Sequence, residues 1–155
     1  MTGSTDISQA RNFRKVNERL LTSGQPNESQ LASARAAGVE VVINLALHDD
    51  PRYSLQDEPG TVESLGMTYV HIPVQFGAPT EANLLAFFAA MDAHRGRALL
   101  VHCGANYRVS AFLGLYNMLK RGHPRDEAFA LMDSVWKPNP VWTQFLEEMS
   151  SRPAR

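Results

Sequence analysis

The stretch from Ala98 to Ser110 constrains the fold more than any other part of the chain. It runs from a short apolar segment into His102 and Cys103, the only cysteine, and then through a small polar loop to Arg108. Apolar residues after the arginine recur at helical spacing, so the pattern predicts a buried strand, a tight turn and a helix. Such a turn presents backbone N–H groups at a helix N-terminus, which favours an anion.

Strand and helix patterns alternate along the rest of the chain. Apolar runs predict strands over 19–22, 40–45, 68–74 and 98–102, and helices over 28–37, 61–65, 80–95, 108–120, 125–136 and 141–149. This order predicts an α/β fold with a central, mostly parallel sheet of about four to five strands flanked by helices. We expect a flexible N-terminal tail over residues 1–11 and a single domain over residues 12–150.

Composition narrows the class of protein. The 155-residue chain has 15 basic and 16 acidic residues, which gives a net charge of −1 and no basic excess for nucleic acid or an anionic membrane. No apolar run approaches the roughly 18 residues that span a bilayer. A single cysteine excludes an internal disulfide and a thiolate-rich metal site. An unpaired thiol and a polar N-terminus favour the cytoplasm, although a secreted form whose leader has been removed stays compatible; the oligomeric state is not indicated.

Cys103 carries the clearest chemistry in the turn. A thiolate is a nucleophile, and it forms at neutral pH where N–H groups and cations surround the sulfur. Arg108 follows five positions later, and its guanidinium can hold two oxygens of one anion in a bidentate fork. A cation in the first turn of a helix opposes the helix dipole, which makes a purely structural role for Arg108 unattractive. A buried core cysteine is the competing interpretation.

The stretch resembles the signature loop of cysteine-dependent phosphatases, in the dual-specificity-like branch of the protein tyrosine phosphatase superfamily. That family has His-Cys, five residues, Arg and then Ser or Thr, whereas four residues separate Cys103 from Arg108 here. Ser110 stands where the family keeps its hydroxyl, and Val109 occupies the family's arginine position. Either the loop is one residue shorter, or the arginine has moved back one position.

A bacterial group of phosphatase-like proteins has the same shorter spacing, and the chain is also similar to it in Leu20–Pro26 and Val41–Leu45. The resemblance covers residues 12–150. It implies a dual-specificity-phosphatase-like fold that hydrolyses phosphomonoesters, aryl or phosphotyrosine-like, on a protein or a small molecule, through a phosphocysteine and without a metal or other cofactor. It implies catalytic roles for Cys103, Arg108 and Ser110, and a phosphate-binding loop of His102, Gly104, Ala105, Asn106, Tyr107 and Val109.

The family's proton donor has no counterpart at the expected place. The family places an aspartate on a loop between a strand and the long helix that precede the cysteine, but here residues 71–80 contain no carboxylate. Gln75 stands near the expected position, and an amide cannot donate a proton to a leaving alkoxide. Asp49 and Asp50, in a long polar loop, are substitutes whose competing interpretation is a solvated turn, and His71 is another. Phenolic leaving groups need little protonation, so activity on aryl esters survives without a donor.

Two other functions compete with phosphatase activity. Rhodanese-like sulfurtransferases also place a basic residue after a four-residue gap, carry a persulfide and need no general acid, which suits the Cys103–Arg108 spacing and Gln75. A pseudophosphatase that binds phosphate without turnover also fits the altered loop. The surroundings of the loop, namely His102, the long helix after Arg108 and the segment 122–128, favour the phosphatase.

Overall fold

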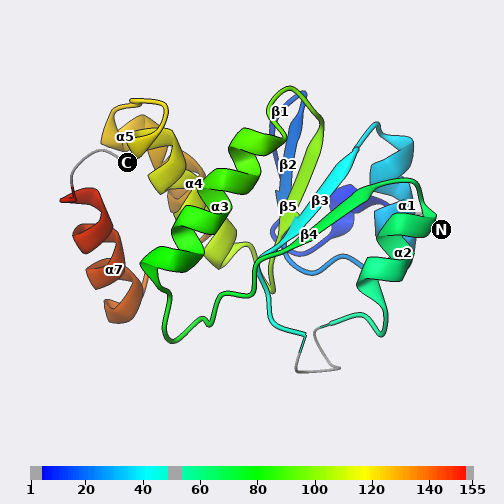
Figure 1. Ribbon diagram of the computed structural model, residues 1–155, viewed down its shortest axis with the longest axis horizontal. Coiled ribbons are helices and arrows are strands. Elements are labelled where there is room, and N and C mark those ends of the chain that lie inside the picture. Colours follow the sequence, from blue (N-terminus) through cyan, green and yellow to red (C-terminus); the bar gives the residue numbers. More distant parts are fainter. Residues whose placement is uncertain (1–4, 49–53, 153–155) are drawn as a thin grey trace.

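The computed structural model describes residues 5–48 and 54–152. At its centre lies a five-stranded sheet with the strand order β1-β2-β5-β3-β4 (Figure 1). The four parallel strands are β2 (Leu20–Ser23), β5 (Leu99–His102), β3 (Val41–Asn44) and β4 (Thr68–His71). The edge strand β1 (Arg14–Asn17), which sequence reasoning missed, is antiparallel to β2. The predicted α/β fold with a mostly parallel sheet is therefore confirmed.

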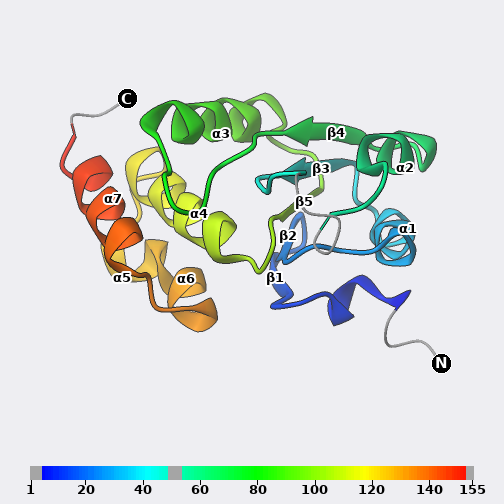
Figure 2. The same cartoon turned by 90° about the horizontal axis from the view of Figure 1, so that it is seen from below.

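Helices cover both faces of the sheet (Figures 1 and 2). On one face lie α1 (Glu28–Ala36) and α2 (Glu58–Ser64). On the other lie α3 (Glu81–Ala93) and α4 (Tyr107–Leu119), and α4 is contacted in turn by α5 (Arg125–Ala128), α6 (Ala130–Val135) and α7 (Pro140–Ser150). Because both faces are covered, every residue of β3 and β5 is buried.

The alternation of side chains along these strands divides the core into two layers. Ile43 and Val101 belong to the layer under α3, α4 and α7. Val42 and Leu100, one position away, belong to the layer under α1, where Leu31 is fully buried. The sequence run of apolar residues at 98–101 is thus shared between two cores.

The N-terminal segment is packed where the structure describes it. A 3-10 helix over Ile7–Gln9 buries Ile7 and Ala10 in the α1 layer, and the Ile7 N–H donates to Ser33 Oγ at 3.0 Å. The sequence did not indicate this packing of Ile7 and Ala10, and the flexible tail over residues 1–11 as a whole stays a prediction. One isoleucine in a polar stretch gives no periodic signal, which is why the segment was missed. The domain span 12–150 stays a prediction.

Two helices also differ from their predicted bounds. The helix predicted over 61–65 begins earlier, at Glu58, after the N-cap Asp57, whose side chain accepts from Gly60 N–H. The helix predicted over 125–136 is divided at Phe129, whose ring packs on Gly114 so closely that a Cβ there would lie 2.2 Å from it. Among the helices of the described segments, none combines the length and apolar character needed to cross a membrane.

Candidate active site

The last residues of the parallel strands form a row across the C-terminal edge of the sheet. The register aligns Ser23 with His102, His102 with Asn44, and Asn44 with His71. Aligned residues of neighbouring strands project to the same face, which here is the face covered by α2. Cys103 comes one position after His102 and lies fully buried in the layer of α3 and α4. At this edge, the polar side chains therefore lie on the α2 face of the sheet, and Cys103 lies on the opposite face.

The helix after the cysteine has an uncapped N-terminus. Its N-cap, Asn106, has φ 69° and ψ 8° and makes no capping bond with its side chain. By contrast, the N-cap side chains of α1, α2, α3 and α7 each accept from a backbone N–H of the first turn. The Ser110 N–H donates to the Asn106 carbonyl at 3.1 Å, so the N–H groups of residues 107–109, which precede this bond, have no acceptor in the helix. Free N–H groups at the start of a helix form an anion site.

Residues from other segments donate hydrogen bonds to the carbonyls of the turn between Cys103 and α4. The Gly104 carbonyl accepts from the Gln25 N–H at 3.2 Å, and the Ala105 carbonyl accepts from Asn12 Nδ2 at 2.9 Å. In a trans peptide the N–H points away from the C=O. The Ala105 N–H, which shares its peptide with the Gly104 carbonyl, therefore faces away from Gln25 and adds a donor to the inner side of the turn.

Arg108 keeps one edge of its guanidinium free. Nη1 donates to the Val74 carbonyl at 2.8 Å, and a Cβ on Gly104 would lie 3.2 Å from Nη2. Nε is buried, and within residues 5–48 and 54–152 it has no acceptor. Nε and Nη2 form the side-on fork that binds carboxylates and phosphates. The free fork thus lies beside the turn that begins with Gly104.

The two residues after the arginine have different surroundings from those expected. Val109 is fully buried in the core, so the family's arginine position holds a packing side chain and contributes only its N–H. Ser110 is also buried, and its Oγ donates to the Tyr107 carbonyl at 3.1 Å. The described contacts include no hydrogen bond from Ser110 to the Cys103 sulfur.

The loop after β4 lies beside Arg108 but offers no proton donor. Gln75 is exposed and directly follows Val74, whose carbonyl binds the arginine. His71 Nε2 lies 2.6 Å from the Ala46 carbonyl, so this nitrogen donates to the backbone. The substitutes Asp49 and Asp50 lie outside the described residues.

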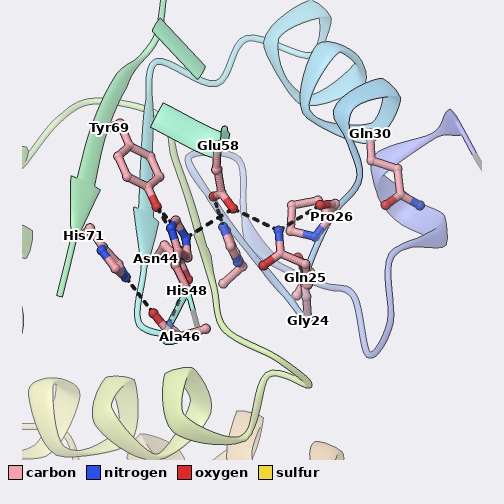
Figure 3. Close-up of polar contacts among 12 residues, drawn as sticks. Gly24, Gln25, Pro26, Gln30, Asn44, Ala46, His48, Glu58, Tyr69 and His71 are labelled. Atoms are coloured by element: carbon pink, nitrogen blue, oxygen red, sulfur yellow. Dashed lines mark hydrogen bonds and ion pairs between the residues drawn. The ribbon is translucent and has the colours of Figure 1, made fainter. Parts of the chain in front are cut away.

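Sequence reasoning missed the buried carboxylate of Glu58, which lies behind the cysteine. Its Oε2 lies 2.5 Å from His102 Nε2. Its Oε1 accepts from Gln25 Nε2 at 2.9 Å (Figure 3). Burial acts to raise the pKa of Glu58, but the charge of His102 and the two hydrogen bonds outweigh it and hold this pKa below its ordinary value. Asp57 and Pro59 could have marked the helix start, but no sequence signal shows that Glu58 is buried.

A second polar group extends this network along the sheet edge. Asn44 Nδ2 lies 2.8 Å from His48 Nε2 and 3.0 Å from the Tyr69 hydroxyl, and the rings of His48 and His71 stack with centroids 4.4 Å apart (Figure 3). Burial, followed by the neighbouring His71, lowers the pKa of His48. Burial and the charge of Glu58 raise the pKa of Tyr69. In the part of the chain described, no three metal-ligating side chains converge.

A basic hollow of about 560 Å³ lies at the opposite end of the sheet, near the first residues of β2 and β5, and not at Cys103. Its cations include Arg95 and Lys120, which lie just after the ends of α3 and α4. Positive side chains are favoured there by the helix dipoles. The turn around Cys103 therefore remains the candidate site.

Comparison with known proteins identifies the family. Residues 12–119 match the family described as "Beta-lactamase hydrolase-like protein, phosphatase-like domain". The chain belongs to this family. Two curated members of this phosphatase-like family, the Beta-lactamase hydrolase-like proteins of Xylella fastidiosa strains Temecula1 and 9a5c, are 32% identical over 118 residues, which is 75% of this chain and 27% of theirs. The chain thus spans about a quarter of the length of the curated relatives that it matches.

Solved structures agree with this assignment. A DUF442 protein of Shewanella putrefaciens CN-32, described as a candidate phosphatase, is 38% identical with a TM-score of 0.82, covering 94% of this chain and 95% of that one. Tk-PTP (23% identical, TM-score 0.74, covering 92% and 98%) and Pseudomonas aeruginosa TpbA (17%, 0.69, covering 89% and 84%) share the fold. The resemblance to cysteine-dependent, dual-specificity-like phosphatases is confirmed at the level of family and fold.

Proposed function

We propose that this chain is a cysteine-dependent phosphatase that hydrolyses phosphomonoesters with phenolic leaving groups through a phosphocysteine at Cys103. The observation that carries the proposal is the free Nε–Nη2 edge of Arg108 beside an uncapped helix N-terminus. A buried N–H donor without an acceptor, such as Nε of Arg108, is costly unless a ligand occupies it. A tetrahedral dianion fits a fork and a ring of N–H groups.

The proposed reaction has two steps. The Cys103 thiolate attacks phosphorus, an S–P bond forms, and the P–O bond breaks with its electron pair leaving on the phenolate. Arg108 and the N–H groups of residues 107–109 hold the phosphoryl oxygens as charge redistributes. Water then attacks phosphorus, the S–P bond breaks, the thiolate is restored, and the proton of the water is released with inorganic phosphate.

Access to the sulfur requires movement in this proposal. Cys103 is fully buried, and the loop that carries Val74 and Phe76 contacts Arg108 through a hydrogen bond and a ring 5.9 Å from Cζ. Substrate oxygens would take the Nε and Nη2 groups of Arg108, and Nη1 would keep the Val74 carbonyl. Ser110 would turn its hydroxyl from the Tyr107 carbonyl to the sulfur when the thiolate leaves phosphorus.

The substrate class follows from the missing donor. With Gln75 in place of a carboxylate, residues 71–80 cannot protonate the leaving group, and a phenolate departs as an anion far more readily than an alkoxide. TpbA, which shares the fold at 18% identity and a TM-score of 0.61, has been solved in complex with pTyr, a phenolic ester. We propose that the substrate is an aryl phosphate of this kind, on a protein or a small molecule. The reaction proceeds without a metal in this proposal.

The test is phosphate release from 4-nitrophenyl phosphate between pH 5 and 8 without added metal, with Cys103→Ser as control. Turnover that is lost in Cys103→Ser supports the proposal, and a parallel assay with an alkyl phosphate is expected to give far slower release. Equal rates for the two proteins would reject it.

Sulfur transfer is the second candidate, favoured by the four-residue gap between Cys103 and Arg108 and by the absence of a carboxylate in residues 71–80. Here the Cys103 thiolate would take the outer sulfur of thiosulfate as a persulfide and release sulfite, and cyanide would then remove that sulfur as thiocyanate. The same N–H groups and arginine would hold the sulfonate oxygens. Thiocyanate formation that depends on Cys103, without phosphate release, would select this function.

A further inference from the structure

Glu58 is the one Asp, Glu, Lys or Arg of the described segments that is buried, and the proposed reaction does not use it. Removing a carboxylate from water costs several kcal/mol unless its partners compensate. Such a charge is retained here on α2, on the opposite side of the sheet from Cys103. Its partners therefore indicate what the charge does.

Both partners of Glu58 are connected to the turn between Cys103 and α4, which we call the catalytic turn. His102 directly precedes Cys103, and its Nδ1 has no partner in residues 5–48 and 54–152, so the contact with Glu58 is the hydrogen bond that orients the ring. Gln25 donates its side chain to Glu58 and its backbone N–H to the Gly104 carbonyl. The Glu58 carboxylate thus contacts His102, which precedes the nucleophile, and Gln25, which binds the carbonyl of Gly104 just after it.

The other polar groups near Glu58 are more distant. His48 Nε2 lies 3.9 Å from Oε1, and Asn44 and Tyr69 reach this region through His48 (Figure 3). Among the described residues, the short contacts of the carboxylate are therefore those with His102 and Gln25.

We infer that Glu58 is a positioning residue, which holds the turn after Cys103 in its anion-binding geometry by accepting hydrogen bonds from His102 and Gln25. The inference rests on the proposed function and deepens it. Glu58 touches neither the substrate nor the sulfur in this scheme; it fixes the ring before the nucleophile and, through Gln25, the peptide that directs the Ala105 N–H inward.

Glu58→Gln tests this role with little change in volume. The carboxylate accepts on both oxygens, whereas an amide has one acceptor and presents N–H to the second donor. One of the two contacts, with His102 or with Gln25, is then lost. Hydrogen bonds to charged groups are among the stronger ones, so we expect phosphate affinity to fall about tenfold or more.

The direction of the change in Glu58→Gln distinguishes a positioning role of Glu58 from a purely electrostatic one. If Glu58 acted only as a negative charge near the site, its removal would strengthen the binding of inorganic phosphate and speed the alkylation of Cys103 by iodoacetamide, because less repulsion acts on either anion. Positioning predicts the reverse: weaker phosphate binding, measured by titration calorimetry, and slower alkylation. Unchanged or improved values in Glu58→Gln would overturn the inference.

Two control variants of α2 accompany this measurement. Glu63→Gln makes the same chemical change at an exposed position, and we expect wild-type phosphate affinity. Val62→Ala removes fully buried methyl groups and lowers stability while it leaves the Glu58 side chain unchanged. Phosphate affinity should stay near wild type in Val62→Ala. An equal loss there would show that Glu58 acts through general stability and would overturn the inference.

A double-mutant cycle with His102→Asn checks the route. If Glu58 acts through His102, Glu58→Gln has a clearly smaller effect on the alkylation rate in the His102→Asn background, while additive effects would contradict the route. Alkylation of the thiol does not require turnover. Failure of phosphate release in the wild type would therefore reject the proposed function, and the Glu58 dependence of Cys103 reactivity would still be tested.

Discussion

Asn106 is joined to Asn12 at the turn after Cys103: Asn106 Nδ2 donates to the Asn12 carbonyl at 2.8 Å, and Asn12 Nδ2 donates to the carbonyl of the preceding residue, Ala105, at 2.9 Å. Asn106 and Asn12 are the two non-glycine residues with positive φ in the described chain, at 69° and 52°. Asparagine tolerates this left-handed region better than most residues. A second bond from Asn106 Nδ2 to Thr22 Oγ1 at 3.0 Å ties the turn to β2 as well.

Asn106→Ala is expected to lower the free energy of unfolding by about 2–4 kcal/mol, because it removes two buried hydrogen bonds and leaves a less tolerant residue at positive φ. Asn106→Gly should cost less, since glycine adopts this conformation without strain. Urea unfolding of both variants measures the difference. An Asn106→Gly protein less stable than Asn106→Ala would show that backbone strain is unimportant at this position.

Arg108→Lys should lower kcat/KM for an aryl phosphate by about a hundredfold, because lysine keeps the charge but lacks the fork that Nε and Nη2 provide. Steady-state kinetics with 4-nitrophenyl phosphate measure this, and inorganic phosphate as a competitive inhibitor reports ground-state binding. Near-normal activity in Arg108→Lys would mean that a point charge suffices and that the fork has no role.

Gly24→Ala should distort the catalytic turn, since a Cβ there would lie 2.6 Å from the Gly104 carbonyl oxygen. We expect a loss of stability of about 1–3 kcal/mol and weaker phosphate binding. Gly77→Ala, where nothing lies within 4 Å, is the matched control and should unfold like the wild type. Thermal and urea unfolding compare the two, and equal stabilities would contradict the close approach of these backbones.

Glu58 should make stability depend on pH. Burial opposes ionisation, but the charge of His102 and the two hydrogen bonds hold the pKa of Glu58 below the value of about 4.3 that it has in an unfolded chain. The ionised group therefore stabilises the fold above that unfolded value, and the contribution is lost as pH falls through the lower, folded value. The stability difference between wild type and Glu58→Gln should be full at pH 7 and shrink on acidification below about pH 4. A difference that grows in acid would contradict this assignment.

The sequence predicted those parts of the fold that depend on local patterns. Apolar runs located all four parallel strands, and the strand–Cys103–helix order predicted where the turn would lie. The packed Ile7 was missed because it depends on a contact with Ser33, far along the chain. The strand β1 was missed because its residues Arg14–Asn17 are mostly polar and exposed, so no apolar run marks it. Ser110 illustrates the same limit, since its position in the sequence does not reveal that its hydroxyl binds the Tyr107 carbonyl.

The supporting residues of the site could not be predicted for a related reason. Glu58, Gln25 and Asn12 lie 45, 78 and 91 positions before Cys103 in the sequence, and they meet the turn only because the parallel strands end at one edge of the sheet. No spacing rule connects them to the cysteine. Side chains that support a turn through tertiary contacts are visible only in the folded chain.

The most direct test of the account is mass spectrometry of the protein after rapid acid quenching during reaction with 4-nitrophenyl phosphate. We predict a phosphoryl group on the Cys103 peptide of the wild type and none in Cys103→Ser. Full turnover without an adduct on Cys103, or an adduct on another residue, would contradict the proposed phosphocysteine.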